Sequence, residues 1–77
     1  MNFLLTKDQR ILIAGANGMV GSAIHKELIN RGFGLGKFSN NLLTPSKSEL
    51  DFCDYSQVAK WFQSNKPSVV IIAAAKV

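Results

Sequence analysis

The stretch ILIAGANGMVGSAI, residues 11–24, joins an apolar run, three regularly spaced glycines and a second apolar run. The glycines are Gly15, Gly18 and Gly21, and no acidic residue lies among them. The first apolar run is continuous rather than alternating, which is typical of a parallel strand that is covered on both faces. The sequence therefore predicts a buried strand over residues 10–14, and the glycines follow directly at its carboxyl end.

The second apolar run has the spacing of a helix. Val20, Ile24 and Leu28 lie four residues apart and would share one face of a helix over residues 18–31. Gly32 follows, and glycine is the residue most often found just after a helix. We therefore expect a strand, a glycine-rich turn and a helix in direct succession.

The middle of the chain is less regular. Turn-forming residues are frequent there, but a strand is expected within residues 36–44, best matched by residues 41–44, and Pro45 would end it. Asp54 then has the position of a helix cap, because Gln57 follows at the capping-box spacing. A second helix is therefore expected to begin at this aspartate.

The apolar stripe of the second helix consists of Val58, Trp61 and Phe62, which we expect to lie in the core, although the two aromatic residues could instead meet a partner subunit. The segment SVVIIAAA, which starts at Ser68, is rich in β-branched residues and predicts another buried strand. Strands that alternate with helices in the order β-α-β-α-β form a parallel sheet with right-handed crossovers. The predicted fold class is therefore α/β, and residues 1–77 form a Rossmann-type half.

The three glycines suit a phosphate-binding turn. In a β-α-β unit, the first strand points towards the amino end of the next helix, where unpaired N–H groups and the helix dipole attract phosphate. Gly15 would form the tight turn, Gly18 would admit a dinucleotide's pyrophosphate to the backbone, and Gly21 would let helix and strand pack closely. An acidic side chain in this turn would repel such a ligand. The alternative is that the glycines only shape a turn, although a turn needs one glycine rather than three.

The end of the second strand bears on the choice of cofactor. A site for NAD usually has Asp or Glu there, which binds the ribose hydroxyls. Here Ser46 and Lys47 occupy that position, and Glu49 lies beyond them. A cation and hydroxyl groups suit a 2′-phosphate, so NADP is favoured and NAD is the alternative. Asn17 could add a hydrogen bond to the ligand, whereas Lys47 could also be an ordinary surface lysine.

The composition excludes several classes of protein. The chain of 77 residues has 47% hydrophobic and 18% charged residues, as expected of one small globular domain. Its net charge of +4 comes from scattered residues and forms no basic stripe, so no nucleic-acid partner is expected. No apolar run approaches the roughly 20 residues that span a membrane, and the first ten residues lack a signal-peptide pattern, so a cytoplasmic protein is expected. The single Cys53 and the lone His25 suggest no metal site.

Three segments, IAGANGMVGSAI, SELDFCD and AAAKV, make the chain resemble the GDP-L-fucose synthases, which are extended short-chain dehydrogenases/reductases. The resemblance runs from Arg10 to Val77 and covers the N-terminal part of such an enzyme, so the chain would be a truncated part of a larger doubly wound domain. It implies an NADP-dependent oxidoreductase and isomerase that acts on a nucleotide-sugar, GDP-4-keto-6-deoxymannose, in GDP-fucose biosynthesis. A homo-oligomer is expected, because the last strand would leave an apolar edge and face uncovered.

The same resemblance implies a set of cofactor-binding residues. The loop that would wrap the pyrophosphate comprises Gly15, Ala16, Asn17, Gly18, Met19, Val20 and Gly21. Lys47 falls where these enzymes have a basic residue for the 2′-phosphate, and Asn17 replaces another basic residue that they can have. Asp51 and Phe52 match the segment beside the adenine. The strand end that would pass the ribose comprises Ala73, Ala74 and Ala75.

By this resemblance, catalysis would need a Ser and a Tyr-x-x-x-Lys pair, with a Cys and a His for epimerisation, all beyond the end of this chain. The only tyrosine is Tyr55, and Ala59 stands four residues after it. No residue is therefore assigned a catalytic role, and this segment by itself is predicted to be inactive. Two alternatives stay open: a stand-alone or truncated nucleotide-binding module without activity, and another extended short-chain dehydrogenase such as a nucleotide-sugar epimerase or dehydratase.

Overall fold

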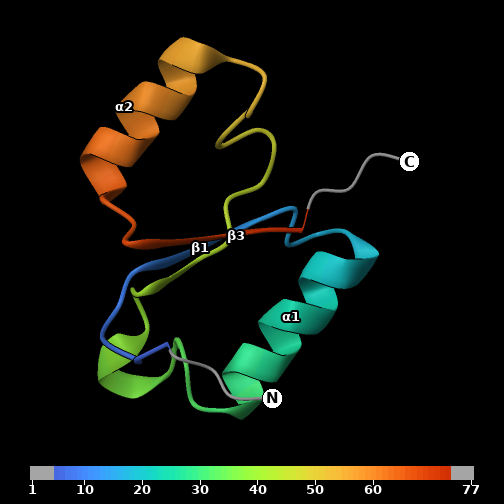
Figure 1. Cartoon of the computed structure of the whole chain (residues 1–77), viewed down its shortest axis with the longest axis vertical. Helices are drawn as coiled ribbons and strands as arrows, with labels where there is room; N and C mark the ends of the chain where they lie inside the picture. The colour runs from blue at the N-terminus through green and yellow to red at the C-terminus, as the bar shows by residue number, and fades with distance from the viewer. Residues whose placement is uncertain (1–4, 74–77) are drawn as a thin grey trace.

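The computed structural model describes residues 5–73, which fold around a three-stranded parallel sheet (Figure 1). The strands are β1 (Ile11–Ala14), β2 (Leu42–Leu43) and β3 (Val69–Ile72), and their order across the sheet is β2-β1-β3. The predicted parallel sheet is confirmed, and so is the order of strands and helices along the chain. The fold is a Rossmann-type α/β half.

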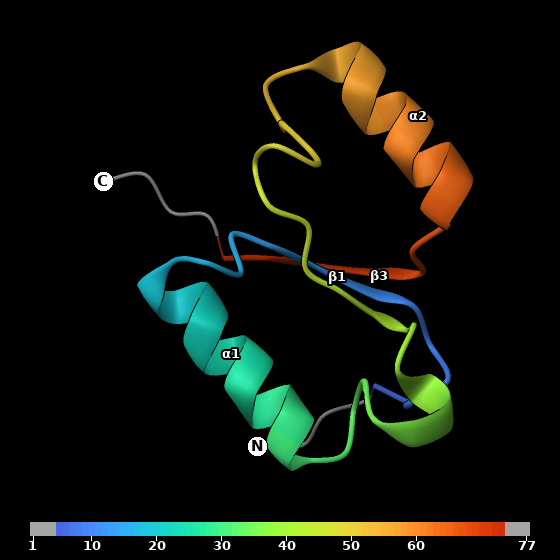
Figure 2. The ribbon, with the colours of Figure 1, turned by 180° about the vertical axis from the view of Figure 1, so that it is seen from behind.

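Two helices connect these strands and lie on opposite faces of the sheet, as Figures 1 and 2 show from the front and from behind. They are α1 (Met19–Asn30) and α2 (Tyr55–Asn65), and a short 3₁₀ helix, η1 (Gly36–Phe38), precedes β2. From β2 the chain crosses back past β1 to reach β3, so the direction in which strands are added reverses at β1. In open α/β sheets, ligands bind beyond the carboxyl ends of the strands at such a reversal.

β1 is the buried centre of the fold. All of its residues are at most 4% exposed, because a strand flanks it on each side and the two faces carry helices. Ile11 pairs with Leu42 of β2 and with Val69 of β3. Leu28 of α1 and Phe33 belong to the same buried cluster as Ile11. The continuous apolar run at the start of the glycine motif thus forms the core strand that it predicts.

α1 matches the predicted helix and has Gly18 and Arg31 as its caps. Gly32 follows with a φ of 91°, a left-handed conformation that suits glycine after a helix. Of the predicted apolar face, Leu28 is fully buried, but Val20 is 57% exposed. The shared apolar face of α1 is therefore only partly buried, because Val20 lines an open apolar groove rather than the core.

α2 begins as predicted, with Asp54 as its cap. The Asp54 Oδ1 atom accepts a hydrogen bond from the backbone N–H of Gln57 at 3.2 Å. The other half of the expected capping box differs, because Gln57 Oε1 accepts from the backbone N–H of Asp51. The helix ends at Lys66, which adopts the left-handed conformation immediately before Pro67. Gln57 therefore links the first turn of α2 to Asp51 in the segment that precedes the helix.

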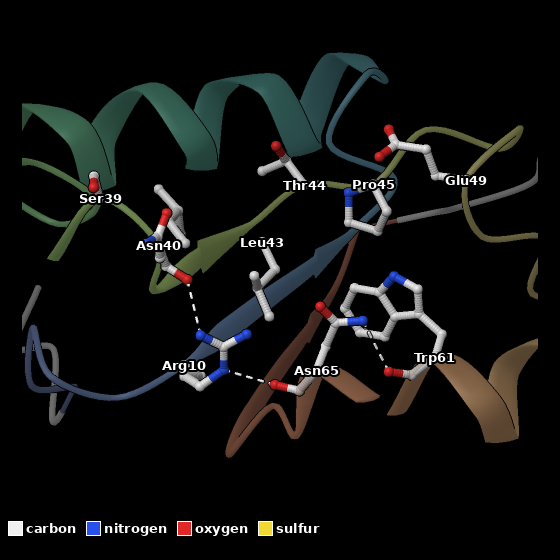
Figure 3. A pocket seen from close by; sticks show the side chains of 10 residues that line it. Arg10, Ser39, Asn40, Leu43, Thr44, Pro45, Glu49, Trp61 and Asn65 are labelled. Carbon is white, nitrogen blue, oxygen red and sulfur yellow. Dashed lines mark hydrogen bonds between the residues drawn. The ribbon is translucent and has the colours of Figure 1, made fainter. Parts of the chain in front are cut away.

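The packing of α2 differs from the prediction. No residue of α2 is buried, and Trp61 and Phe62 are half-buried, with ring centroids 5.6 Å apart in an edge-to-face arrangement. The prediction that these two side chains lie in the core is wrong. A groove that Trp61 lines separates part of α2 from the sheet (Figure 3), so the helix rests beside the sheet without burying its apolar stripe.

Arg10 joins the carboxyl end of α2 to the start of the sheet. Its Nε atom donates to the carbonyl oxygen of Asn65 at 2.6 Å, and its Nη1 atom donates to the carbonyl oxygen of Asn40 at 3.0 Å (Figure 3). The backbone N–H of Ser68 donates to the Arg10 carbonyl oxygen at 2.8 Å. Polar contacts to the backbone therefore hold α2 at this end.

The two outer strands are shorter or more exposed than the sequence predicts. β2 comprises only two of the four residues that the pattern favours. β3 alternates along its length: Val69 and Ile71 pack towards the core, whereas Val70 is 43% exposed and Ile72 is 78% exposed. The prediction that β3 is buried on both faces is wrong, because α2 leaves the face that carries Val70 and Ile72 largely open.

Candidate functional site

The glycine turn lies between the carboxyl end of β1 and the first residue of α1. Gly15 has a φ of 84°, a conformation that residues with a side chain rarely adopt. Its carbonyl oxygen accepts a hydrogen bond from the N–H of Gly18 at 3.0 Å, which closes the turn. Gly15 is therefore required by the backbone of the turn, as the sequence predicts.

Gly21 is required by packing. A Cβ atom at this position would lie 1.9 Å from the carbonyl oxygen of Gly15 and 2.9 Å from the Cα atom of Ala16. Both are backbone atoms of the tight turn, so neither can move away as the end of a flexible side chain could. The amino end of α1 can approach the end of β1 this closely only with glycine at position 21, which is the packing role predicted for it.

Gly18 differs from the other two, because nothing in the described chain requires it. Its φ of −80° is an ordinary value for any residue. A Cβ atom here would meet only the carbonyl oxygen of Gly15, at 3.4 Å, which is ordinary van der Waals contact. Gly18 is also exposed. The protein alone would accept a side chain here, so the missing side chain leaves the backbone open to something outside the chain.

The amino end of α1 can attract an anion. Gly18, its cap residue, makes no side-chain hydrogen bond to the helix, and the first turn contains no acidic residue. Met19, the first helical residue, is 90% exposed. The first N–H groups of a helix have no partner within the helix, and they carry the positive end of its dipole. The turn therefore presents backbone donors without a competing carboxylate.

A cleft of about 280 Å³ lies beside this turn. It is lined by the turn residues Gly15, Ala16 and Asn17 and by Pro45, Lys47, Leu50, Asp51, Phe52 and Cys53 from the segment that follows β2. The structure thus brings together two groups of predicted site residues that are distant in sequence. Cys53, a free and exposed cysteine, lines the same cleft.

Other predicted site residues lie outside this cleft. Met19 and Val20 line an apolar groove of about 670 Å³ on the other side of the turn, together with Ile71 of β3. That groove has the character of an uncovered packing surface, because it is lined mainly by apolar side chains of α1. The backbone of both residues still belongs to the first turn of α1, and only their side chains face away from the cleft.

The predicted alanines at the end of β3 are only partly described. Ala73 is half-buried, and its N–H donates to the carbonyl oxygen of Ala14 at 2.9 Å, so it continues the pairing with β1. Ala74 and Ala75 lie outside the described residues. Ala73 therefore lies at the carboxyl edge of the sheet, next to the strand that leads into the glycine turn.

A turn between β2 and the cleft was not predicted, although its sequence signal is present. The backbone N–H of Ser46 donates to Glu49 Oε1 at 3.1 Å, and the Ser46 hydroxyl donates to the same oxygen at 3.0 Å. These two hydrogen bonds hold the pKa of Glu49 below its usual value. Ser-x-x-Glu is the pattern of a capping box, and here it closes a single turn rather than opening a long helix.

Asp51 is the other carboxylate near the cleft. Its Oδ1 atom accepts a hydrogen bond from the backbone N–H of Cys53 at 2.9 Å. Its own N–H donates to the side chain of Gln57 in α2. The carboxylates of Asp51 and Glu49 are thus each bonded to a backbone N–H a few residues away, and neither forms an ion pair with Lys47 within residues 5–73.

The groove in Figure 3 is larger than the cleft, at about 570 Å³, but it is a weaker candidate site. Residues of α2 and β2 line it, among them Trp61 and Leu43 (Figure 3). Arg10 is its cation, and two of its guanidinium nitrogens already donate to the carbonyl oxygens of Asn65 and Asn40. The groove is therefore best explained as a gap left by the loose packing of α2.

Residues 5–73 offer neither a metal site nor a membrane-spanning helix. No group of three His, Cys, Asp or Glu side chains in this range could hold a metal ion. None of the helices in this part of the chain has the length and apolar character needed to cross a membrane. The glycine turn and its cleft are therefore the arrangement in this range that is best suited to bind a small molecule.

Comparison with known proteins agrees with this geometry. Residues 11–77 match the NAD dependent epimerase/dehydratase family. The chain belongs to this family. It is 41% identical to GDP-L-fucose synthase 1 of Arabidopsis thaliana and 41% identical to GDP-L-fucose synthase of Escherichia coli, and the two matches cover 92% and 90% of this chain. The resemblance to GDP-L-fucose synthases is thereby confirmed.

Solved structures show the same fold. A GDP-mannoheptose C4 reductase from Campylobacter jejuni, solved with NADP bound, superimposes with a TM-score of 0.81 and 34% sequence identity over 95% of this chain. This chain spans only about 20% of the length of these relatives, both in the sequence comparisons and in the structural comparison. The shared part is the β-α-β-α-β segment that carries the glycine turn.

Proposed function

We propose that the chain binds the adenosine and pyrophosphate end of NADP(H), as part of a nucleotide-sugar epimerase/reductase similar to GDP-L-fucose synthase. The observation that supports this most is the contrast among the three glycines. Gly15 and Gly21 are needed by the fold, whereas Gly18 has no internal reason to be glycine. A ligand that must approach the backbone at Gly18 would explain why this position has no side chain.

The pyrophosphate would bind at the amino end of α1. Backbone N–H groups there are the donors, and the helix dipole favours the negative charge. The lack of acidic residues in the turn and in the first turn of the helix supports this placement. Met19, Val20 and Gly21 would contribute through their backbone rather than their side chains.

The adenosine would occupy the cleft beside the turn. Phe52 is 45% exposed there and offers an apolar surface to a base, and Asp51 lies next to it. Lys47 is the cation of the cleft, which supports a 2′-phosphate and therefore NADP over NAD. Asn17 offers an amide side chain to the same cleft. Ala73, which pairs with Ala14 at the carboxyl edge of the sheet, would leave room beside the ribose.

The described residues bind and orient a cofactor, and they offer no catalytic apparatus for the reaction. NADPH would supply hydride to a keto sugar when bound. Tyr55 is 85% exposed in the first turn of α2, and Ala59 occupies the place of the lysine in a Tyr-x-x-x-Lys pair. We therefore expect this chain alone to bind the nucleotide without turning over a nucleotide-sugar.

Self-association is part of the proposal. Val70 and Ile72 are exposed on one face of β3, and the outer edge of β3 pairs with no other strand within residues 5–73. Unpaired strand edges and exposed apolar faces promote association. Sedimentation velocity should show dimers or larger species whose fraction falls when Ile72→Lys is introduced. A concentration-independent monomer for the unchanged chain would contradict this part of the proposal.

The central experiment compares Gly18→Asp with Gly18→Ser, using calorimetric titration with NADPH. Both residues are good helix caps, so both variants should be at least as stable as the original chain. The Asp carboxylate would repel a pyrophosphate at the amino end of α1, so we expect it to weaken binding by at least about tenfold relative to Ser, or about 1.4 kcal/mol. Equal affinity of the two variants for NADPH would contradict the proposed position of the pyrophosphate.

A further inference from the structure

The segment between β2 and α2 carries one cation, Lys47, and three carboxylates, of which Asp54 caps α2. Glu49 and Asp51 each accept a hydrogen bond from a nearby backbone N–H. The Lys47 amine has no hydrogen bond or ion pair to any of the residues from 5 to 73. The acids shape the segment, and the lysine is left available.

Ser46 and Glu49 close a compact turn around Lys47. The carbonyl oxygen of Ser46 accepts from the N–H of Glu49 at 3.0 Å and from the N–H of Leu50 at 2.9 Å. The Glu49 side chain returns to the Ser46 N–H and hydroxyl, and the hydroxyls of Ser46 and Ser48 are 2.9 Å apart. Leu50, only 1% exposed, anchors the end of the turn in the protein.

The turn places its charges on two different sides. Lys47 lines the cleft beside the glycine turn, whereas Glu49 lines the separate groove next to α2. Figure 3 shows the Glu49 side chain beside Pro45, which borders both cavities. The Glu49 carboxylate therefore lies outside the cleft that Lys47 lines.

We propose that Glu49 is a positioning residue that, by closing this turn, holds Lys47 over the cleft and so sets the preference for a 2′-phosphate. This inference rests on the proposed function. A lysine is a flexible point charge that loses side-chain entropy when it is held in place. A closed turn fixes its backbone beforehand and keeps the neighbouring carboxylate from pairing with it.

The proposal predicts that removing Glu49 weakens binding of the 2′-phosphate, whereas simple electrostatics predicts that it strengthens this binding. If Glu49 acted only through its negative charge, its removal would strengthen binding of a ligand with an added phosphate. If Glu49 acts by closing the turn, Glu49→Ala should weaken the contribution of the 2′-phosphate although a negative charge has been removed. Glu49→Gln should largely preserve it, because the Gln Oε1 atom can still accept from the Ser46 N–H.

The experiment uses adenosine 2′,5′-bisphosphate and adenosine 5′-monophosphate, which differ only in the 2′-phosphate. Affinities of the full chain for both are measured by nuclear magnetic resonance titration, and their ratio is compared among variants. We expect Glu49→Ala to lower the ratio by about fivefold, towards the value of Lys47→Ala, given that a hydrogen bond to a charged group contributes up to about a hundredfold. Ser56→Ala, an exposed position in α2, should leave the ratio unchanged.

The outcomes separate this inference from the proposed function. A general loss of stability would weaken both ligands together and leave the ratio unchanged. Should Glu49→Ala unfold, Ser46→Ala weakens the same turn by removing one of its two bonds to Glu49, and it should lower the ratio in the same direction. If the original chain prefers the bisphosphate but neither variant lowers the ratio, the role of Glu49 is refuted and the nucleotide site stands. If the original chain binds neither ligand, both proposals are refuted.

Discussion

The two connections that meet at the carboxyl edge of the sheet are built in different ways. Between β1 and α1, the backbone itself shapes the turn: Gly15 has a φ that favours glycine, and Gly21 leaves no room for a Cβ atom. Between β2 and α2, the carboxylates of Glu49, Asp51 and Asp54 accept hydrogen bonds from backbone N–H groups and so shape the segment.

This difference suggests a division of labour in cofactor recognition. A pyrophosphate is common to NAD and NADP, and it suits a backbone site that side-chain substitutions do not easily change. The 2′-phosphate distinguishes the two cofactors, and it suits a segment in which a single side chain can be replaced. Because the α1 connection is tightly packed and the α2 connection is more loosely held, substitutions in the two should have effects of different size.

The largest expected difference concerns packing. Leu28→Ala removes a fully buried side chain of α1 and should lower the free energy of unfolding by about 3 kcal/mol. Val58→Ala on half-buried α2 should lower it by only about 1 kcal/mol. Urea unfolding followed by Trp61 fluorescence measures both, with Lys26→Ala as an exposed control. Equal losses for Leu28 and Val58 would mean that α2 packs as tightly as α1.

The next effect tests the glycine turn. Gly21→Ala should lower the free energy of unfolding by about 2 kcal/mol, because its Cβ would overlap backbone atoms of the turn. Ser22→Ala, the adjacent exposed position, should change it by less than about 0.5 kcal/mol. The same urea experiment compares the two variants. A Gly21→Ala protein as stable as the original would contradict the close approach of α1 to β1.

A smaller effect is expected at the cap of α2. Asp54→Ala removes the acceptor for the Gln57 N–H and should cost about 1 kcal/mol, whereas Asp54→Asn should restore most of the stability. Hydrogen exchange at the Gln57 N–H provides a local readout. Unchanged protection of this N–H in Asp54→Ala would show that the cap does not hold the helix start.

The smallest effect concerns the charge of Glu49. Its pKa in the folded chain is lowered from an ordinary value of 4.5 by its bonds to Ser46, so ionised Glu49 favours the folded state. This contribution should be fully present above pH 4.5 and should disappear as the pH falls through the lower folded value. The difference in thermal midpoint between the original chain and Glu49→Gln, measured against pH, should follow this course. A difference that stays constant through this range would contradict it.

Features that depend on neighbouring residues in the sequence were predicted more completely than features that depend on packing between distant segments. The core strand, the turn at Gly15, the close packing at Gly21 and the Asp54 cap depend on neighbours in sequence, and the structure has each of them as expected. Whether Trp61 is buried depends on how closely α2 approaches the sheet, which no local pattern specifies. The exposure of Ile72 likewise depends on which elements cover β3.

The candidate site shows the same contrast. Lys47 and Asp51 were predicted from the sequence and its resemblance, and the cleft beside the glycine turn includes both. The Ser46–Glu49 turn was overlooked, because a capping-box pattern is usually read as the start of a long helix. Its signal was local and could have been found by asking which group would satisfy the Ser46 N–H.

The most direct test of the central claim is a titration of the ¹⁵N-labelled chain with NADP⁺, followed through the backbone amide resonances. If the pyrophosphate binds where α1 begins, the amides of residues 18–21 should show the largest shift changes, and Gly18→Asp should abolish them. Contradiction would take the form of unchanged resonances at residues 18–21, or of the largest changes at residues around the groove that Arg10 and Trp61 line.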